Sequence, residues 1–255
     1  MAVDFGLVGK TALVTGASRG IGRSIALAFA AAGADVALLA RDRERLDVVA
    51  AEIAVLGRRA VVVSADVLDR DATRAACAQA LAELGHLDVV VNNAGGNSWA
   101  APLLAARYDG WTKAVRLNLD STVHVLQALG EHLVAQGSGS VINVGSVSAL
   151  RGAPMMSHYA AAKAALMSLT ATVALEWASS GVRVNALLPG WVETDLTAFA
   201  RNDERTERAL LSRVPMGRWA TGDEIAGPAL FLASPASGFM TGATLIVDGG
   251  LNVNA

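Results

Sequence analysis

The sequence is poor in cysteine, proline and tyrosine, with one, six and two of these in its 255 residues. A single cysteine cannot form an internal disulfide, so a cross-linked scaffold is excluded. Cys77 lies in an alanine-rich helical pattern, and we interpret it as a small buried residue rather than a reactive thiol. No set of metal ligands stands out in the sequence, and we expect no metal site.

Charge is also scarce, because only 17% of the residues are charged and the net charge is −2. The lack of any basic run argues against a nucleic-acid partner. The longest apolar stretches are broken by Ser24 or Asp35, well short of the roughly 18 residues that a membrane span needs. The first expected strand begins about ten residues from Met1, which leaves no room for a secretion signal. We therefore expect a cytoplasmic protein that contacts no membrane.

Hydrophobic residues are plentiful, at 53% of the chain, and many occur in short runs that alternate with longer helical patterns. The runs lack polar alternation, which predicts strands buried on both faces. The expected strands are residues 11–15, 35–40, 60–64, 87–92, 140–144, 183–188 and 244–248. The sequence therefore predicts an α/β fold, a doubly wound (Rossmann-type) parallel sheet of about seven strands with helices on both faces. No linker or repeat interrupts the pattern, so residues 1–255 are expected to form a single domain.

A glycine-rich segment, TGASRGIG (15–22), lies between the first expected strand and the first expected helix. Its G-x-x-x-G-x-G spacing lets the backbone turn tightly and approach a ligand closely. The helix that follows begins with free N–H groups, which favour a pyrophosphate. In a doubly wound fold, ligands bind beyond the carboxyl ends of the strands. The segment therefore predicts a dinucleotide site at that edge of the sheet.

A tyrosine, a lysine and a serine form the candidate catalytic set. Tyr159 lies four residues before Lys163 in an expected helix, so the two side chains share one face. A nearby ammonium lowers the pKa of a tyrosine, which makes the phenol usable as an acid or base near neutrality. Ser146, at the end of the fifth expected strand, is placed to donate a hydrogen bond to a carbonyl oxygen that gathers negative charge.

Taken together, these motifs resemble the short-chain dehydrogenase/reductase family over essentially the whole chain. TGASRGIG is similar to the family's cofactor loop, NNAG (92–95) to its motif after the fourth strand, and PGWVET (189–194) to the segment that holds the nicotinamide. TGATLIVDGG (241–250) resembles the usual C-terminus. The resemblance implies an NAD(P)(H)-dependent oxidoreductase that interconverts a ketone and a secondary alcohol by hydride transfer.

The resemblance also implies roles for particular residues. Tyr159 would act as general acid or base, Ser146 would polarise the carbonyl, and Lys163 would lower the tyrosine pKa and hold the nicotinamide ribose. Asn118 in VRLNLD corresponds to the family's helix asparagine and would anchor a water in the proton relay. The implied cofactor contacts are Gly16, Ser18, Arg19, Gly20, Ile21, Gly22, Arg41, Asp66, Val67, Asn93, Ala94, Gly95, Tyr159, Lys163, Pro189, Gly190, Val192 and Thr194.

The end of the second expected strand predicts which cofactor is used. An acid at this place would grip the free ribose 2′-hydroxyl of NAD(H), but the chain reads Leu39-Ala40-Arg41. Asp35 begins the strand and therefore lies at its wrong end. Arg19 and Arg41 offer the positive charge and fork-shaped donors that a 2′-phosphate needs. We expect NADP(H) as the preferred cofactor, with NAD(H) as the alternative.

The substrate walls are expected in the segments that follow the strand ends, together with a helical, mixed-charge lid over residues 194–219. The expected wall residues are Asn97, Ser98, Trp99, Ala149, Leu150, Arg151, Met155, Met156 and Trp191. These segments are bulky and apolar and carry one cation, an arginine suited to a carboxylate or phosphate. The expected substrate contacts are Trp99, Leu150, Arg151, Met155, Met156 and Trp191. His158 matches no family motif and is interpreted as rim or packing.

Several alternatives stay open at this point. The chain resembles both 3-oxoacyl-[acyl-carrier-protein] reductases and sugar or polyol dehydrogenases. Residues 135–140 and 178–181, taken to flank the entrance, carry no cation for an acidic carrier protein, which favours a small ketone or alcohol substrate. A cofactor-sensing or scaffold protein without turnover is the alternative from another class. The resemblance also implies a homotetramer built on the alanine-rich helix expected over residues 157–178 and on the C-terminal strand.

Overall fold

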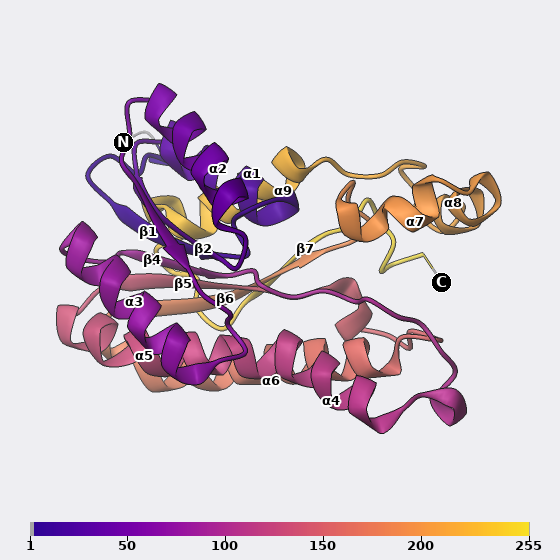
Figure 1. The fold of residues 1–255 in the computed structure, drawn as a ribbon. Helices are drawn as coiled ribbons and strands as arrows, with labels where there is room; N and C mark the ends of the chain where they lie inside the picture. The colour runs from indigo at the N-terminus through magenta and orange to yellow at the C-terminus, as the bar shows by residue number, and fades with distance from the viewer. Residues whose placement is uncertain (1–2, 255) are drawn as a thin grey trace.

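Seven parallel strands form one continuous sheet in this computed structural model, which describes residues 3–254 (Figure 1). Their order across the sheet is β3-β2-β1-β4-β5-β6-β7, and every neighbouring pair is parallel. The strands are β1 (Thr11–Thr15), β2 (Asp35–Ala40), β3 (Ala60–Ser64), β4 (Val89–Asn92), β5 (Gly139–Val144), β6 (Val182–Pro189) and β7 (Thr244–Val247). The predicted doubly wound parallel sheet is confirmed.

The strand ends agree with the predicted runs to within two residues, and the largest difference is at the start of β4. Residues 87 and 88 were expected in this strand, but the carboxylate of Asp88 accepts hydrogen bonds from the Lys10 ammonium and the Thr11 amide, both at 2.9 Å. These contacts hold Asp88 in the connection that precedes the strand. The backbone of Asp88 still bonds to Thr11 at 3.0 Å and to Ser140 at 2.8 Å, so the predicted and observed starts of β4 differ only by the usual one or two residues of an element boundary.

Helices cover both faces of the sheet (Figure 1). One layer contains α1 (Gly20–Ala31), α2 (Arg43–Val55) and α9 (Gly222–Ala233). The other contains α3 (Arg70–Leu84), α5 (Ser121–Gln136) and α6 (Ser157–Trp177), with α4 (Tyr108–Val115) packed against α6. Two short helices, α7 (Ala198–Arg201) and α8 (Glu204–Leu211), follow β6 and extend beyond the end of the sheet (Figure 1).

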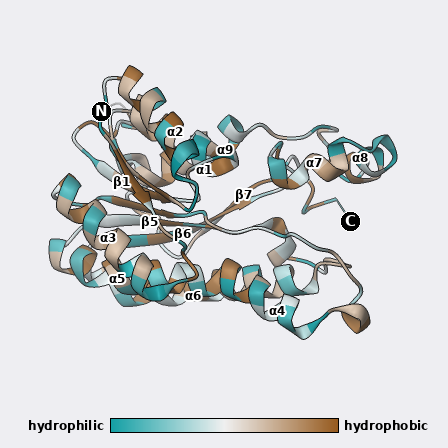
Figure 2. Ribbon diagram, in the orientation of Figure 1, coloured by the Kyte–Doolittle hydropathy of each residue, from teal (hydrophilic) through white to brown (hydrophobic). Residues whose placement is uncertain are grey.

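Two apolar cores fill the space between the sheet and its helix layers. Alternate strand residues point to opposite faces, so Ala12 and Val14 enter the core beneath α1, while Leu13 enters the core that contains Cys77 of α3. In Figure 2 the strands at the centre are largely brown or pale, whereas the helices on either side mix hydrophobic and hydrophilic residues. Over residues 3–254, the structure has no helix that is both long and apolar enough to cross a membrane.

The order of the strands creates a crevice at one edge of the sheet. The chain moves from β1 outward to β2 and β3, then returns to place β4 on the other side of β1. The loops after β1 and β4 therefore diverge over opposite faces of the sheet. A ligand site is expected beyond the carboxyl ends of the strands at such a reversal.

Cys77 supplies the first test of this packing. Its side chain is fully buried, and burial raises the pKa of the thiol to about 12. At pH 8 only about one thiol in ten thousand is therefore ionised, and the thiolate is the reactive form. We expect no reaction with a thiol-specific reagent at pH 8 in the native protein, and one equivalent after unfolding in guanidinium. Rapid labelling of the native protein would contradict the structure.

Candidate active site

A cavity of about 1190 Å³ lies at the carboxyl ends of β1 to β6. It therefore occupies the edge of the sheet that the strand reversal selects. Most of the predicted catalytic and cofactor-binding residues line it: Gly16, Ser18, Arg19, Gly20, Ile21, Arg41, Asp66, Val67, Asn93, Ala94, Gly95, Ser146, Tyr159, Lys163, Pro189, Gly190, Val192 and Thr194. Two predicted residues, Gly22 and Asn118, do not line it: Gly22 packs against Gly16, and Asn118 bonds to Gly96.

The glycine loop forms one wall of the cavity. Gly16 and Gly20 have left-handed φ angles of 65° and 54°, which few other residues adopt. A Cβ on Gly22 would overlap the carbonyl oxygen of Gly16, so this glycine is needed for packing within the loop. No side chain caps the first turn of α1, which leaves its backbone N–H groups free for a ligand. These features fit the pyrophosphate of a dinucleotide.

The NNAG segment holds the glycine loop in place. Oγ1 of Thr15 accepts hydrogen bonds from the amides of Asn93 and Ala94, at 3.0 and 2.9 Å. The side-chain Nδ2 of Asn93 donates to the carbonyl oxygens of Thr15, at 2.9 Å, and Gly16, at 3.3 Å. The β1 and β4 loops are therefore joined at the switch point of the sheet.

The candidate catalytic residues converge on the middle of the cavity. Ser146 follows β5, whereas Tyr159 and Lys163 lie on one face of α6. Nζ of Lys163 is 5.8 Å from the ring centroid of Tyr159 and donates a 2.7 Å hydrogen bond to the carbonyl of Val144. The Ser146 hydroxyl accepts a hydrogen bond from the amide of Ser148 at 3.2 Å. A backbone amide in the turn after β5 therefore orients the serine, and a backbone carbonyl at the end of β5 orients the lysine.

Burial dominates the electrostatics of this set. It raises the pKa of Tyr159 above its usual value, and the neighbouring Ser146 hydroxyl lowers the pKa by less. Burial also lowers the pKa of Lys163 to about 8. The sequence predicts a tyrosine pKa lowered by the ammonium, and the structure shows a different balance. Nζ of Lys163 bonds to a β5 carbonyl and not to the phenol, and burial has the largest effect on the pKa of Tyr159.

Asn118 lies in a π-helical turn, Arg116–Asp120, between α4 and α5. Its side chain is buried and engaged on both sides. Oδ1 accepts from the amide of Gly96 at 3.0 Å, and Nδ2 donates to the carbonyls of Gly96 at 2.8 Å and Ala114 at 2.9 Å. Asn118 therefore fixes the loop after β4. Its role in a proton relay stays a prediction.

Three arginines lie at the far end of the cavity, near the ends of β2 and β3. Nη1 of Arg19 lies 2.8 Å from Oδ2 of Asp195, and Nη1 of Arg41 lies 3.8 Å from Oδ2 of Asp66. Arg45, which sequence reasoning missed, is 3.6 Å from Asp195. The signal for Arg45 was available, because it lies one helical turn beyond Arg41 at the start of the predicted helix.

Asp35 lies at the opposite edge of the sheet, as the sequence predicts. It pairs with Thr11 at the first register position of β1 and β2, and it is 2.7 Å from the guanidinium of Arg58. The carboxyl end of β2 is Ala40, and the next carboxylate, on Asp42, accepts a hydrogen bond from the amide of Arg45 at the N-terminus of α2. No acid therefore ends β2.

The predicted substrate contacts are not among the residues that line this cavity. Arg151 donates to the carbonyl of Leu251 at 2.8 Å, and Trp191 packs edge-on against Trp219 with ring centroids 5.7 Å apart. Trp99 stacks on His158. Leu150 and Met155 are exposed, and Met156 is half-buried beside them. Asn97 and Ser98, which were also expected on the substrate side, do line the cavity, together with Leu196 and Thr197 of the expected lid.

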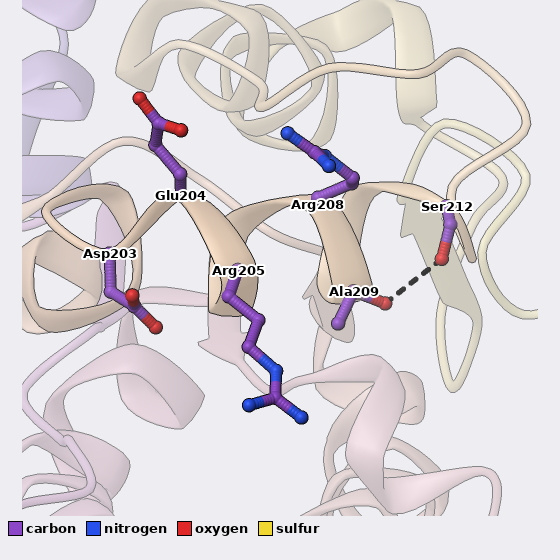
Figure 3. Close-up of a pocket in the computed structure, with 6 residues that line it drawn as sticks. All are labelled: Asp203, Glu204, Arg205, Arg208, Ala209 and Ser212. Carbon is purple, nitrogen blue, oxygen red and sulfur yellow. Dashed lines mark hydrogen bonds between the residues drawn. The ribbon is translucent and has the colours of Figure 1, made fainter.

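Two further surfaces bear on the expectations from the sequence. The α8 segment of the expected lid carries a depression of about 670 Å³, lined by Asp203, Glu204, Arg205, Arg208, Ala209 and Ser212 (Figure 3). Its mixed charges lie outside the catalytic cavity. Residues 135–140 and 178–181 meet at the amino ends of β5 and β6, the edge opposite the cavity. The placement of these segments at the entrance was wrong, so their lack of cations says nothing about the substrate.

The comparisons with known proteins agree with this geometry. The family model described as Enoyl-(Acyl carrier protein) reductase matches residues 16–252. A short-chain type dehydrogenase/reductase from Mycobacterium marinum has a similar structure, with a TM-score of 0.91, 38% identity and 97% coverage of both chains. The chain belongs to the short-chain dehydrogenase/reductase family. This confirms the resemblance in the sequence.

Other members of the short-chain dehydrogenase/reductase family are similar over almost their full length. The 2-dehydro-3-deoxy-D-gluconate 5-dehydrogenase of Pseudoalteromonas atlantica is 40% identical over 257 residues, 98% of each protein. A gluconate 5-dehydrogenase from Burkholderia cenocepacia, solved with NADP and tartrate, has a TM-score of 0.95, 39% identity and 99% coverage of both chains. The protein is an NAD(P)-dependent oxidoreductase that interconverts a ketone and a secondary alcohol.

Gly22 tests the packing of the cofactor loop. In Gly22→Ala the new Cβ meets the Gly16 carbonyl, and such overpacking costs about 1–3 kcal/mol. We expect a matching loss in the free energy of unfolding from denaturant titration, together with weaker cofactor binding. Gly152→Ala is the control, because a Cβ there meets nothing within 4 Å. Equal stability of the two variants would show that the loop is packed differently.

Proposed function

We propose that this enzyme transfers hydride between NADP(H) and a small hydroxylated ketone or the corresponding polyol, with Tyr159 as the proton carrier. One observation supports this most strongly: Ser146, Tyr159 and Lys163 line the same cavity as the glycine loop. A nicotinamide cofactor bound along that loop therefore meets the catalytic set at its far end. The sugar substrates named for relatives support the choice of substrate class.

In this proposal, the cofactor supplies or accepts the hydride, and the chain handles binding and protons. The Ser146 hydroxyl donates to the substrate oxygen and stabilises its developing negative charge. The phenol of Tyr159 protonates that oxygen during reduction and accepts the proton during oxidation. Lys163 supplies donors beside the tyrosine, and its carbonyl partner on Val144 fixes their direction.

Replacing the tyrosine tests this assignment. Tyr159→Phe keeps the shape of the side chain and removes its proton. We expect kcat to fall by something like 10²–10⁴-fold, the usual contribution of a general acid or base, with the cofactor Kd unchanged. Steady-state rates and a cofactor binding titration measure the two effects separately. Near-native kcat in this variant would remove Tyr159 from the mechanism.

The arginines near β2 support NADP(H) as the preferred cofactor. No acid ends β2, and the guanidinium groups of Arg19, Arg41 and Arg45 line the same end of the cavity. A 2′-phosphate carries the charge that such a cluster stabilises, and guanidinium groups bind phosphate with paired donors. The carboxylate of Asp195 pairs with both Arg19 and Arg45 in this structure. A bound 2′-phosphate would replace this carboxylate as the partner of the two guanidinium groups.

We expect NADPH to bind at least tenfold more tightly than NADH, a difference of ~1.4 kcal/mol. Replacing Ala40 by Asp and Arg41 by Ser should reverse the order, because an acid then meets the ribose hydroxyl. Arg45→Ala should weaken the binding of NADPH and leave the binding of NADH unchanged. Arg59→Ala is the matched control, since Arg59 precedes β3 at the opposite edge. Equal dissociation constants for the two cofactors in the native protein would refute the preference.

The substrate class distinguishes the proposed polyol dehydrogenase from the alternative function, a carrier-protein reductase. A 3-oxoacyl-[acyl-carrier-protein] reductase would use an acyl thioester, whereas the polar side chains of Asn97 and Ser98 in the cavity suit a hydroxylated molecule. NADPH oxidation across polyol-derived ketones, simple ketones and acyl thioesters distinguishes the two. Turnover of thioesters alone would favour the carrier-protein reaction.

We also propose a homotetramer. Ala161 and Ala164 are exposed on α6, and Ile246 is exposed on the edge strand β7, so both elements offer surface to a second copy. Small residues on a helix allow close packing, and closed symmetry is common among oligomers. The cytoplasmic location and the single domain stay predictions from the sequence.

A further inference from the structure

His158, the residue before Tyr159 on α6, has a fully buried imidazole. Its ring stacks on the indole of Trp99, with centroids 3.6 Å apart and planes 9° from parallel. Its Nε2 lies 2.7 Å from Oδ1 of Asn97. One side chain next to the catalytic tyrosine therefore contacts both ends of the segment 97–99, which follows β4.

The surroundings of the ring fix its tautomer. Nδ1 of His158 is buried and has no hydrogen-bond partner within residues 3–254. A neutral imidazole carries one N–H, and an unpaired buried N–H is rarer in proteins than an unpaired acceptor. The proton is therefore on Nε2, which donates to Oδ1 of Asn97. Burial lowers the pKa of His158, in agreement with a neutral ring.

This hydrogen bond orients the amide of Asn97. With Oδ1 turned toward His158, the two N–H groups of Nδ2 point away from it. Across the described chain, no residue accepts a hydrogen bond from this Nδ2, and Asn97 lines the cavity together with Ser146 and Tyr159. The amide therefore offers unused donors in the cavity that also holds Tyr159.

The segment that carries Asn97 is anchored on both sides. Asn118 bonds to the amide and carbonyl of Gly96, at 3.0 and 2.8 Å. The amide of Ala101 donates to the carbonyl of Met155 at 2.9 Å. Met155 has a φ of 69°, an unfavourable conformation for a residue with a side chain, and such strain often marks a functional loop. Asn97 is thus held in a fixed place before a substrate arrives.

The type of donor indicates the type of group it binds. An uncharged amide suits a neutral hydroxyl better than a carboxylate or phosphate. The arginines that line the cavity, Arg19, Arg41 and Arg45, lie at its other end, and Nζ of Lys163 donates to Val144. A site built to donate to a hydroxyl strongly disfavours an analogue that lacks it, because the donor is then left unpaired.

We propose that Asn97 selects substrates with a hydroxyl next to the reacting carbonyl, and that His158 is the positioning residue that orients Asn97 for this task. The inference rests on the proposed function and adds a specificity determinant to it. Trp99, expected from the sequence to contact substrate, here holds His158 in place through the stacked ring.

The test compares 3-hydroxy-2-butanone with 2-butanone, which differ by one hydroxyl. We expect the native enzyme to prefer the hydroxyketone by at least about tenfold in kcat/KM. In Asn97→Ala this preference should disappear because kcat/KM for the hydroxyketone falls. The kcat/KM for 2-butanone should change by no more than about twofold, and the NADPH Kd should be unchanged. Asn97→Asp keeps the acceptor for His158 and loses the donors, so it should behave like Asn97→Ala.

Variants of the histidine test the positioning role. His158→Leu should lose the preference, and His158→Gln should restore part of it, because its amide supplies an N–H for Asn97. His86→Gln is the control, since His86 is partly exposed beside Asp88 at the amino edge of β4. If His158→Leu does not fold, the two Asn97 variants still decide the role of Asn97, and a hydroxyketone preference in His158→Gln as strong as that of the native enzyme would contradict the positioning role of His158.

Two results would overturn the inference while the proposed function stands. One is a native enzyme that reduces both ketones equally well. The other is an Asn97→Ala variant that loses activity equally on both, which would mean a general structural role. Failure to reduce any ketone in the wider panel would instead refute the proposed function, and the inference with it.

Discussion

The hydrogen bonds between NNAG and the glycine loop are the contact on which the site depends. They join the first βα loop to the loop after β4, which the strand order sends over opposite faces of the sheet. Asn93 occupies the carbonyls of Thr15 and Gly16, so the glycine loop keeps its shape without a ligand. The N–H groups of α1 remain free for a pyrophosphate as a result.

Much of the fold was predictable because its strands are buried on both faces. Such strands appear in the sequence as short apolar runs, and their ends reflect the length of sheet that the helices cover. The start of β4 lies two residues after the predicted start, at a boundary where Asp88 bonds to β1 through both its carboxylate and its backbone. Contacts between strands depend on their register, which a local pattern does not contain.

The site was predictable where a sequence motif fixes the backbone conformation. It was much less predictable where tertiary contacts determine the orientation of a side chain. The glycine loop and Tyr159 lie in the cavity because loop and helix geometry place them there. Position after a strand end did not bring Trp99 or Arg151 to the cavity wall, since a stacked histidine and the carbonyl of Leu251 provide other partners. His158 was interpreted only as rim or packing, because its partners Asn97 and Trp99 are distant in sequence.

The candidate catalytic groups pack closely around Gly95, which has no side chain. A Cβ on Gly95 would lie 2.9 Å from Oδ1 of Asn118 and 3.3 Å from Nζ of Lys163. Both groups are already committed to backbone partners, on Gly96 and Val144, and have little freedom to move away. The glycine of NNAG therefore lets the asparagine, the lysine and the β4 loop meet beneath Tyr159. Because the same loop continues directly into Asn97, any shift at Gly95 would displace the proposed hydroxyl donor as well as the lysine.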